Sequence, residues 1–457
     1  MKLSSCILLA LLPFSVFAQA YKNPLQRAQR NAYVIQQGEV TNLSQVIAVA
    51  LEKNYQIRIA RTQEQITQFN ATYGNAGFLP VLTGNLSRNN SRQNLQQEYF
   101  SAQAPTNVSG VLNANTVVGV NLNWTLFNGL GMFILYDQLA EQTRLAEVTT
   151  RANVEQTVAN IATSYYNVVR QLQRLLTLRQ ALDISRDRLE LARDSYEVGT
   201  RSKVDFLSAQ VDYNTDSSAL LTQTQLLQAA KIGLNQLLVR DPNTEFAVRD
   251  SIIARNNLAI EPLRESLSTN NPLLIAAVYN RHIADLSIKL AKAQQLPTVT
   301  FQSGYNYTSI NNQGGFGVRS ANNTTLLYNL QASVPIFNGL NQRRLNQVAR
   351  ANSVIAEYQE ANQRIVLQTA LEQTYSQYVN NLNLLNLEVQ NNQLANQNVD
   401  IAYDRYRIGN STFVEFRDVQ RNAIDAQNRL IEAEYNAKAA EIELLRLSST
   451  ITRDLAQ

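Results

Sequence analysis

Two long stretches of the chain carry apolar residues at helical spacing and contain neither glycine nor proline. The first lies between Gly131 and Gly199, and the second lies between Gly339 and Gly409. Apolar residues recur every seven positions through the first stretch, which is typical of a coiled coil. They are Val154, Ile161, Val168, Leu175, Leu182, Leu189 and Tyr196. A helix over residues 129–198 would be roughly 100 Å long at about 1.5 Å per residue, which exceeds an ordinary globular core.

Shorter segments between these helical stretches alternate apolar and polar residues with a period of two. They cover residues 118–126, 299–307 and 326–334, with a weaker segment at 81–87. This alternation is typical of strands in a membrane β-barrel, but a half-buried soluble sheet has the same pattern. The alternation therefore predicts strands and leaves both kinds of sheet open. We expect polar loops at about 88–115 and 308–324, and helices at about 43–73 and 264–294.

The same landmarks occur twice, in the same order. The pairs are Asn54-Tyr55 with Asn271-Pro272, Leu79-Pro80 with Leu296-Pro297, Phe127-Asn128-Gly129-Leu130 with Phe337-Asn338-Gly339-Leu340, Tyr196-Glu197-Val198-Gly199 with Tyr406-Arg407-Ile408-Gly409, and Val204-Asp205-Phe206 with Val414-Glu415-Phe416. The offset is 217 residues for the first two pairs and 210 for the others. We therefore predict two structural repeats, residues 41–240 and 261–450.

Each repeat is predicted to contain one strand pair followed by one helical hairpin. The strand pairs cover 79–127 and 296–337, and the hairpins cover 129–238 and 339–448, with their turns at Gly199 and Gly409. The predicted fold class is mostly α with some β. Four strands cannot close a membrane barrel, because the smallest have about eight. A barrel would require several chains, with eight strands in a dimer and twelve in a trimer.

The start of the chain is typical of an export signal. Lys2 precedes an apolar stretch, and small residues at Val16 and Ala18 predict a signal peptide over 1–18, with cleavage after Ala18 or Ala20. The single cysteine, Cys6, lies inside this signal. No stretch approaches eighteen consecutive apolar residues, so entry into a membrane would require a closed barrel. The net charge of +4 without a Lys/Arg run argues against a nucleic-acid partner.

The sequence contains no motif that predicts catalysis. It has no phosphate-binding loop, no glycine-rich dinucleotide turn and no GxSxG elbow. The single histidine, His282, cannot form a metal cluster alone, and we interpret it as a solvated or packed helix position. We therefore predict that the protein is not an enzyme and has no catalytic residue, metal site or cofactor.

The ordered landmarks resemble those of the TolC family of outer-membrane efflux proteins over almost the whole mature chain. The resemblance implies a homotrimer with a twelve-stranded β-barrel in outer-membrane lipid and a long-helix coiled-coil tunnel in the periplasm. Conduction would be passive, from an inner-membrane transporter through a periplasmic adaptor (membrane fusion) protein that docks near Gly199 and Gly409. The cargo is left open between drugs, ions and secreted polypeptides. The alternative is a periplasmic coiled-coil structural or adhesive protein without a channel.

The resemblance also implies a gate at the hairpin turns. Asp205 matches a carboxylate that bonds to a tyrosine matching Tyr406, while Glu415 and Asp418 match acids that face the pore. Ser411 stands where a gate arginine is expected.

The gate residues also have structural explanations. Asp205 and Glu415 each fit a capping box, and Asp418 fits an exposed helix acid. Tyr406 also fits seam packing, because it continues the heptad.

Overall fold

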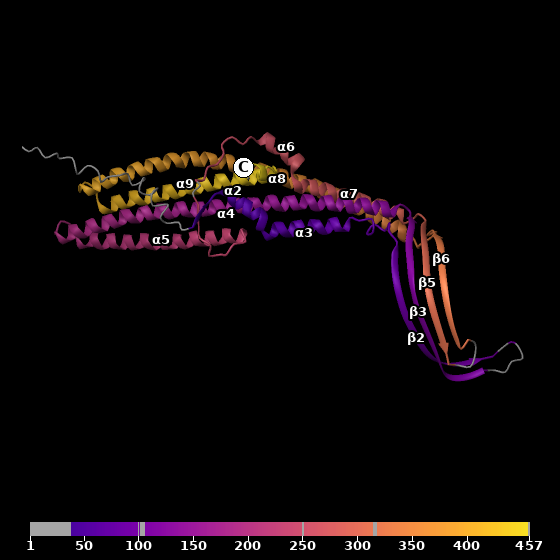
Figure 1. Cartoon of the computed structure of the whole chain (residues 1–457). Helices are drawn as coiled ribbons and strands as arrows, with labels where there is room; N and C mark the ends of the chain where they lie inside the picture. Colours follow the sequence, from indigo (N-terminus) through magenta and orange to yellow (C-terminus); the bar gives the residue numbers. More distant parts are fainter. Residues whose placement is uncertain (1–37, 99, 101–105, 249–250, 314–317, 456–457) are drawn as a thin grey trace, which may run out of the picture. The chain divides into compact units, whose positions relative to one another are not determined.

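The computed structural model describes residues 38–98, 100, 106–248, 251–313 and 318–455 (Figure 1). The predicted signal peptide, residues 1–18, lies outside the described residues. The chain forms two compact units. A helical unit contains the described parts of Met1–Arg58, Asn153–Asn270 and Leu367–Gln457, and a strand unit contains Ile59–Ala152 and Asn271–Val366. The predicted combination of long helices with a smaller number of strands is confirmed.

The strand unit contains one antiparallel sheet of four long strands, which lie side by side in Figure 1. Its strands are β2 (Val81–Gln97), β3 (Thr106–Asn128), β5 (Thr298–Asn312) and β6 (Ser320–Ser333). The order is β2-β3-β5-β6, so the central β3–β5 pairing joins one strand hairpin from each half of the chain. Within the described chain, β2 and β6 each have one edge without a neighbouring strand.

The two faces of the sheet differ in chemistry. On one face Trp124 of β3 pairs with Phe301 of β5, which pairs with Leu330 of β6. Large apolar side chains on this face are exposed, among them Leu86 at 75% and Tyr328 at 77%. The opposite face carries amides: Asn121 donates to Asn85 at 2.7 Å, and Asn306 donates to Asn121 at 3.2 Å. Period-two alternation therefore separates an apolar face from an amide-rich face, as predicted.

The strands extend much further than predicted, and the predicted loops at 88–115 and 308–324 are wrong in extent. β2 continues to Gln97 and β3 begins at Thr106. Near the loop that joins them, β2 and β3 are mostly polar on both faces of the sheet. Their backbones still pair with each other there, although the sequence shows no apolar alternation. At the other end, β6 stops at Ser333, just before Pro335, which has no N–H to donate to a strand partner.

The predicted helices at 43–73 and 264–294 are each two helices. They are α2 (Leu43–Lys53) with α3 (Tyr55–Asn70), and α6 (Ile260–Asn270) with α7 (Pro272–Ala293). The breaks lie at Asn54 and Asn271, whose side chains are buried and cap the following helix. Asn54 Oδ1 accepts from the N–H of Gln56 at 2.8 Å, and Asn271 Oδ1 accepts from Leu273 at 2.9 Å. A capping asparagine thus marks each break, and in the second one Pro272 follows it as the first residue of α7.

Four long helices form the two helical hairpins. They are α4 (Gly131–Glu197), α5 (Lys203–Leu237), α8 (Asn341–Arg407) and α9 (Phe413–Leu447). The predicted heptad is buried at Ile161, Val168 and Leu175, whereas Tyr196 beside the turn is 39% exposed. None of the helices in the described ranges combines the length and the apolar character that crossing a membrane requires.

Three small elements were not predicted. β1 (Glu39–Thr41) pairs in parallel with β4 (Phe246–Val248), and α10 (Ile451–Leu455) follows α9. Tyr165 of α4 donates its hydroxyl to the carbonyl of Thr41 at 3.1 Å, which attaches β1 to the core. Strands of three residues are too short to give a period-two signal.

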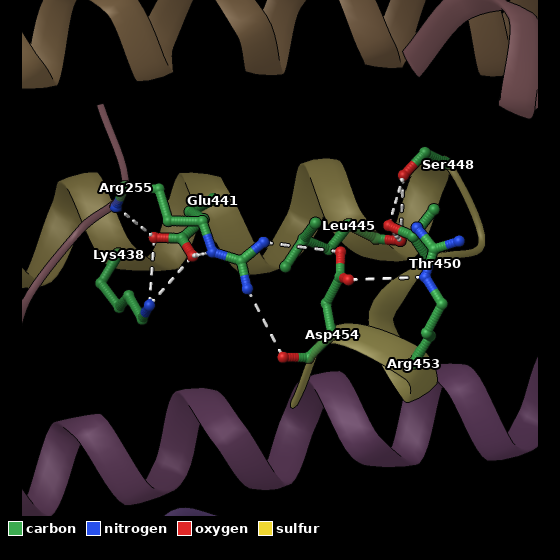
Figure 2. A network of polar contacts seen from close by, with 8 residues as sticks. All are labelled: Arg255, Lys438, Glu441, Leu445, Ser448, Thr450, Arg453 and Asp454. Atoms are coloured by element: carbon green, nitrogen blue, oxygen red, sulfur yellow. Dashed lines mark hydrogen bonds and ion pairs between the residues drawn. The ribbon is translucent and has the colours of Figure 1, made fainter. Parts of the chain in front are cut away.

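A buried ion cluster fastens α10 and the segment before α6 to α9 (Figure 2). Glu441 is completely buried and accepts from Lys438 Nζ at 3.0 and 3.1 Å. It also accepts from the backbone N–H of Arg255 at 2.9 Å. The Arg255 guanidinium lies 3.5 Å from Glu441 and 3.5 Å from Asp454 of α10. Glu441 therefore joins α9 to the distant segment at Arg255, and Arg255 in turn contacts α10.

Candidate functional site

The two helical hairpins turn through the same backbone motif. At the end of α4, the N–H of Thr200 donates to the carbonyl of Ser195 at 2.9 Å, and Gly199 adopts a φ of +76°. At the end of α8, the N–H of Asn410 donates to the carbonyl of Arg405 at 2.9 Å, and Gly409 adopts a φ of +81°. Both are Schellman turns, in which a left-handed residue ends the helix.

The candidate gate acids Asp205 and Glu415 lie in the first turns of α5 and α9. The hydroxyl of Ser202 accepts from the N–H of Asp205 at 3.2 Å, and that of Thr412 accepts from Glu415 at 3.2 Å. The caps use only the backbone of the two acids, which leaves their carboxylates free for other contacts. The Glu415 carboxylate lies 3.4 Å from Arg405, and both side chains are about half exposed.

Tyr406 is buried, and its hydroxyl is bonded to a different partner from the one that the family resemblance implies. Arg201 Nη1 donates to the Tyr406 hydroxyl at 2.7 Å, and its guanidinium lies 4.5 Å from the centre of the ring. The ring also stacks on Phe416 with centroids 5.5 Å apart. Within the described residues, Asp205 makes no bond to Tyr406. Tyr406 thus combines seam packing with a polar contact between the two hairpins.

Asp418 lies on the exposed surface of α9, three residues beyond Glu415. Within the described part of the chain its carboxylate has neither an ion pair nor a hydrogen bond. An exposed, unpaired carboxylate is available to solvent ions or to another copy of the chain. The structure therefore brings Tyr406 together with Arg201 and leaves Asp205 and Asp418 without side-chain partners in this chain.

A buried ion network that the sequence did not reveal lies further along the hairpins. Arg417 of α9 forms a bidentate pair with Asp216 of α5, with both distances at 3.0 Å. Arg188 of α4, whose side chain is completely buried, donates to Asp212 of α5 at 2.8 Å. Ser185 donates to Asp216. Burial lowers the pKa of the Arg188 guanidinium, and the Asp212 carboxylate opposes this effect. The network ties α4 and α5 to α9 within one chain.

The strand exits at Phe127-Asn128-Gly129 and Phe337-Asn338-Gly339 start the long helices. Asn128 Oδ1 accepts from the N–H of Met132 at 2.9 Å, and Asn338 Oδ1 accepts from Gln342 at 3.2 Å. In each case the glycine and the leucine after it have positive φ. Phe127 is the second-to-last residue of β3 and is half-buried, whereas Phe337 lies beyond β6 and is 78% exposed.

The two strand-exit glycines offer a matched test of this junction. A Cβ on Gly129, which has a φ of +68°, would lie 2.3 Å from the carbonyl oxygen of Ala293, whereas a Cβ on Gly339, with a φ of +65°, would meet no atom within 4 Å. We expect Gly339→Ala to cost about 1 kcal/mol of stability through backbone strain alone. Gly129→Ala should cost about 2 kcal/mol more, because backbone must move. Urea unfolding of both variants measures the difference, and equal losses would contradict the close approach at Gly129.

No group of three or more His, Cys, Asp or Glu side chains in the described ranges is arranged to hold a metal ion. Each of the two long helical hairpins follows a strand hairpin in the chain.

The family comparison agrees with this architecture. The family model for "Outer membrane efflux protein" matches residues 46–239 and 263–449. This is well over half of the chain, and the chain therefore belongs to the outer membrane efflux protein family. The predicted resemblance is confirmed, and with it the class, an efflux protein of the outer membrane.

Individual relatives are distant in sequence. The outer membrane protein TolC of Vibrio cholerae serotype O1 is 24% identical over 201 residues, which cover 44% of this chain and 45% of that protein. The match thus spans less than half of that relative's length.

Solved structures share the fold over most of the chain. The Campylobacter jejuni CmeC outer membrane channel has a TM-score of 0.74 at 13% identity. The alignment covers 98% of this chain and 94% of the CmeC chain. The outer membrane protein VceC from Vibrio cholerae has a TM-score of 0.70 at 18% identity, with coverage of 89% and 95%.

Proposed function

We propose that the protein is a channel-tunnel that passively conducts substrates out of the periplasm, and that it is not an enzyme. The observation that carries this proposal is the sheet. Its apolar face exposes large side chains such as Leu86, Leu326 and Tyr328, and β2 and β6 each have a free edge among the described strands. A soluble sheet buries such a face and protects such edges, whereas a barrel strand meets lipid and pairs with its neighbours.

The proposed assembly is a homotrimer. Three copies would place β6 of one chain beside β2 of the next and give twelve strands. The apolar face, including Trp124, would contact outer-membrane lipid. We further propose that a periplasmic adaptor docks at the turns around Gly199 and Gly409 and that an inner-membrane transporter supplies the energy. The alternative remains a periplasmic coiled-coil structural or adhesive protein.

Fractionation distinguishes these two functions. If the proposal is correct, the protein is recovered from outer-membrane fractions and migrates on gels at the size of a trimer that heating converts to monomer. Purified protein in planar bilayers should give single-channel currents. Recovery as a soluble periplasmic monomer would favour the coiled-coil alternative.

For the gate, we propose that Asp205, Tyr406, Glu415 and Asp418 line or hold the periplasmic entrance. What supports this is that Glu415 and Asp418 lie exposed, three residues apart on α9, close to the turn at Gly409. A threefold axis would turn each exposed acid into a ring of three carboxylates, which binds divalent cations. Tyr406 and Arg201 would hold the two hairpins together beside that ring.

The gate proposal predicts the effect of Asp418→Ala on cation block. The variant removes three negative charges from the ring in the trimer. The divalent-cation concentration that blocks half of the current should therefore rise roughly tenfold, which corresponds to a loss of about 1.4 kcal/mol in binding free energy. Single-channel current against calcium concentration measures this. Asp425→Ala, which removes another exposed acid from α9, is the control and should leave block unchanged. Unchanged block in Asp418→Ala would exclude Asp418 from the pore.

A further inference from the structure

A cavity of about 280 Å³ lies in the helical unit, between α4, α8 and α9. One part of its wall is aliphatic and includes Leu176, Ile184 and Val399. Another part is polar and includes Gln173 and Glu434. A cavity of this size is just below the usual range for small-molecule sites, which are mostly apolar with a few placed polar groups.

The polar part of the wall presents hydrogen-bond acceptors that have no donor. Within the described part of the chain, the half-buried Glu434 carboxylate makes no hydrogen bond or ion pair, and the buried Oε1 of Gln173 has no partner. Two more deeply buried acids of the same unit have cationic partners: Asp216 is paired with Arg417, and Glu441 with Lys438. Glu434 is only partly buried, and its carboxylate lacks the cationic partner that these two acids have.

None of the described residues that line the cavity is a cation. Arg170 and Arg174 on α4 are the nearest cations in sequence to Gln173, and both are bound to Glu432, at 3.1 and 2.7 Å. Among the residues that line the cavity from α4, α8 and α9, Glu434 is the one ionisable group. The wall of the cavity therefore supplies no cationic donor to Glu434.

We propose that this cavity binds a small organic cation, with its ammonium group donating to Glu434 and to Gln173 Oε1 and its apolar body against the aliphatic wall. An ammonium group has three donors and no acceptor, which matches a site of unpaired acceptors. A charge-assisted bond to a carboxylate is also stronger than a neutral one.

The site has a built-in pH dependence. Burial raises the pKa of Glu434 to about 7, so its carboxylate is mostly ionised at pH 8 and mostly protonated at pH 6. The protonated form offers one acceptor fewer and no charge. Affinity for a cation should therefore fall about tenfold between pH 8 and pH 6, in proportion to the ionised fraction.

Benzylamine and benzyl alcohol are matched probes for the experiment, because they differ mainly in charge. Titration calorimetry on the purified full chain in detergent at pH 8 should give a dissociation constant on the order of 1 mM or below for benzylamine. Benzyl alcohol should bind at least about tenfold more weakly. Glu434→Gln should remove this preference for the amine, whereas Asp425→Asn, which neutralises an exposed acid of the same helix, should retain it.

Ala423→Leu extends the test, because it fills the cavity and leaves the carboxylate in place. It should weaken both probes, and a circular dichroism melt establishes that each variant is folded. Equal binding of benzylamine to the wild type and to Glu434→Gln, or equal binding of the two probes to the wild type, would overturn the proposal. Either result would leave the conduction test in bilayers unaffected, so the two proposals fail separately.

Discussion

Glu441→Gln is expected to lower the free energy of unfolding by about 3–5 kcal/mol, because it leaves a buried ammonium without its counter-ion. Lys438 is only 8% exposed at its side chain, and Glu441 is its ion-pair partner at 3.0 Å. Glutamine has the same shape but no charge, and its amide nitrogen would face the donors of Lys438 and Arg255. The ammonium then keeps its desolvation cost and loses its main compensation. Urea unfolding followed by circular dichroism measures the change.

Two controls separate the buried charge from a general weakening of this region. Arg453→Ala removes a pair at 3.6 Å from the same cluster, but Arg453 is 71% exposed, so the loss should stay within about 0.5 kcal/mol. The double variant Lys438→Met, Glu441→Gln removes both charges and should recover much of the lost stability. A double variant as unstable as Glu441→Gln alone would mean that packing, not the unpaired charge, dominates.

The sequence predicted the long helices well, because their signals are local and repeated. The stretch from Gly131 to Gly199 has no helix breaker, and its heptad residues Ile161, Val168 and Leu175 are buried as expected. The break at Asn54 could not be found in this way. It depends on a side-chain cap and on the bond from Asn54 Nδ2 to the carbonyl of Leu237 at 2.7 Å, which brings together residues far apart in the chain.

The strands were predicted only where one face is apolar. Alternation marked residues 118–126, but the distal part of β2, which runs to Gln97, has polar residues on both faces and gave no signal. The two-repeat division remains a prediction, although the described elements follow the same order, strand pair then helical hairpin, in both halves. Its strongest support is that Asn128 and Asn338 cap the starts of α4 and α8 in the same way.

The sequence predicted the turns of the candidate site but not the buried ion network between its helices. The sequence placed Gly199 and Gly409 correctly at the turns, since a left-handed residue at a helix end leaves a local signal. It did not reveal the pairing of Arg188 with Asp212, which joins α4 to α5. A usable signal existed: Arg188 falls on the same helix stripe as the buried Ser185 and Ala192, where an uncharged residue is expected. A charge on a buried stripe requires a counter-charge elsewhere, but its position requires the tertiary structure.

Asp216→Asn is the second large effect that we expect, with a loss of about 3–5 kcal/mol in the free energy of unfolding. Asp216 and Arg417 are each largely buried, with side chains 12% and 13% exposed. Asparagine can accept only one of the two bonds from Arg417. The remaining network would hold Arg188 and Arg417 against Asp212 alone, so the cluster would carry an uncompensated positive charge. Urea unfolding of the purified protein gives the loss.

Comparison with Ser185→Ala and with a double variant assigns that loss to charge. Ser185→Ala removes a neutral donor to the same carboxylate and should cost only about 1 kcal/mol. Asp216→Asn combined with Arg417→Met removes one charge of each sign and should be more stable than Asp216→Asn alone. If Asp216→Asn, Ser185→Ala and the double variant all lost the same free energy of unfolding, the network would stabilise the fold through packing and not through charge. If the charges dominate, α9 is held to α4 and α5 by an ion network within each chain, and any movement of α9 away from them must first separate Arg417 from Asp216.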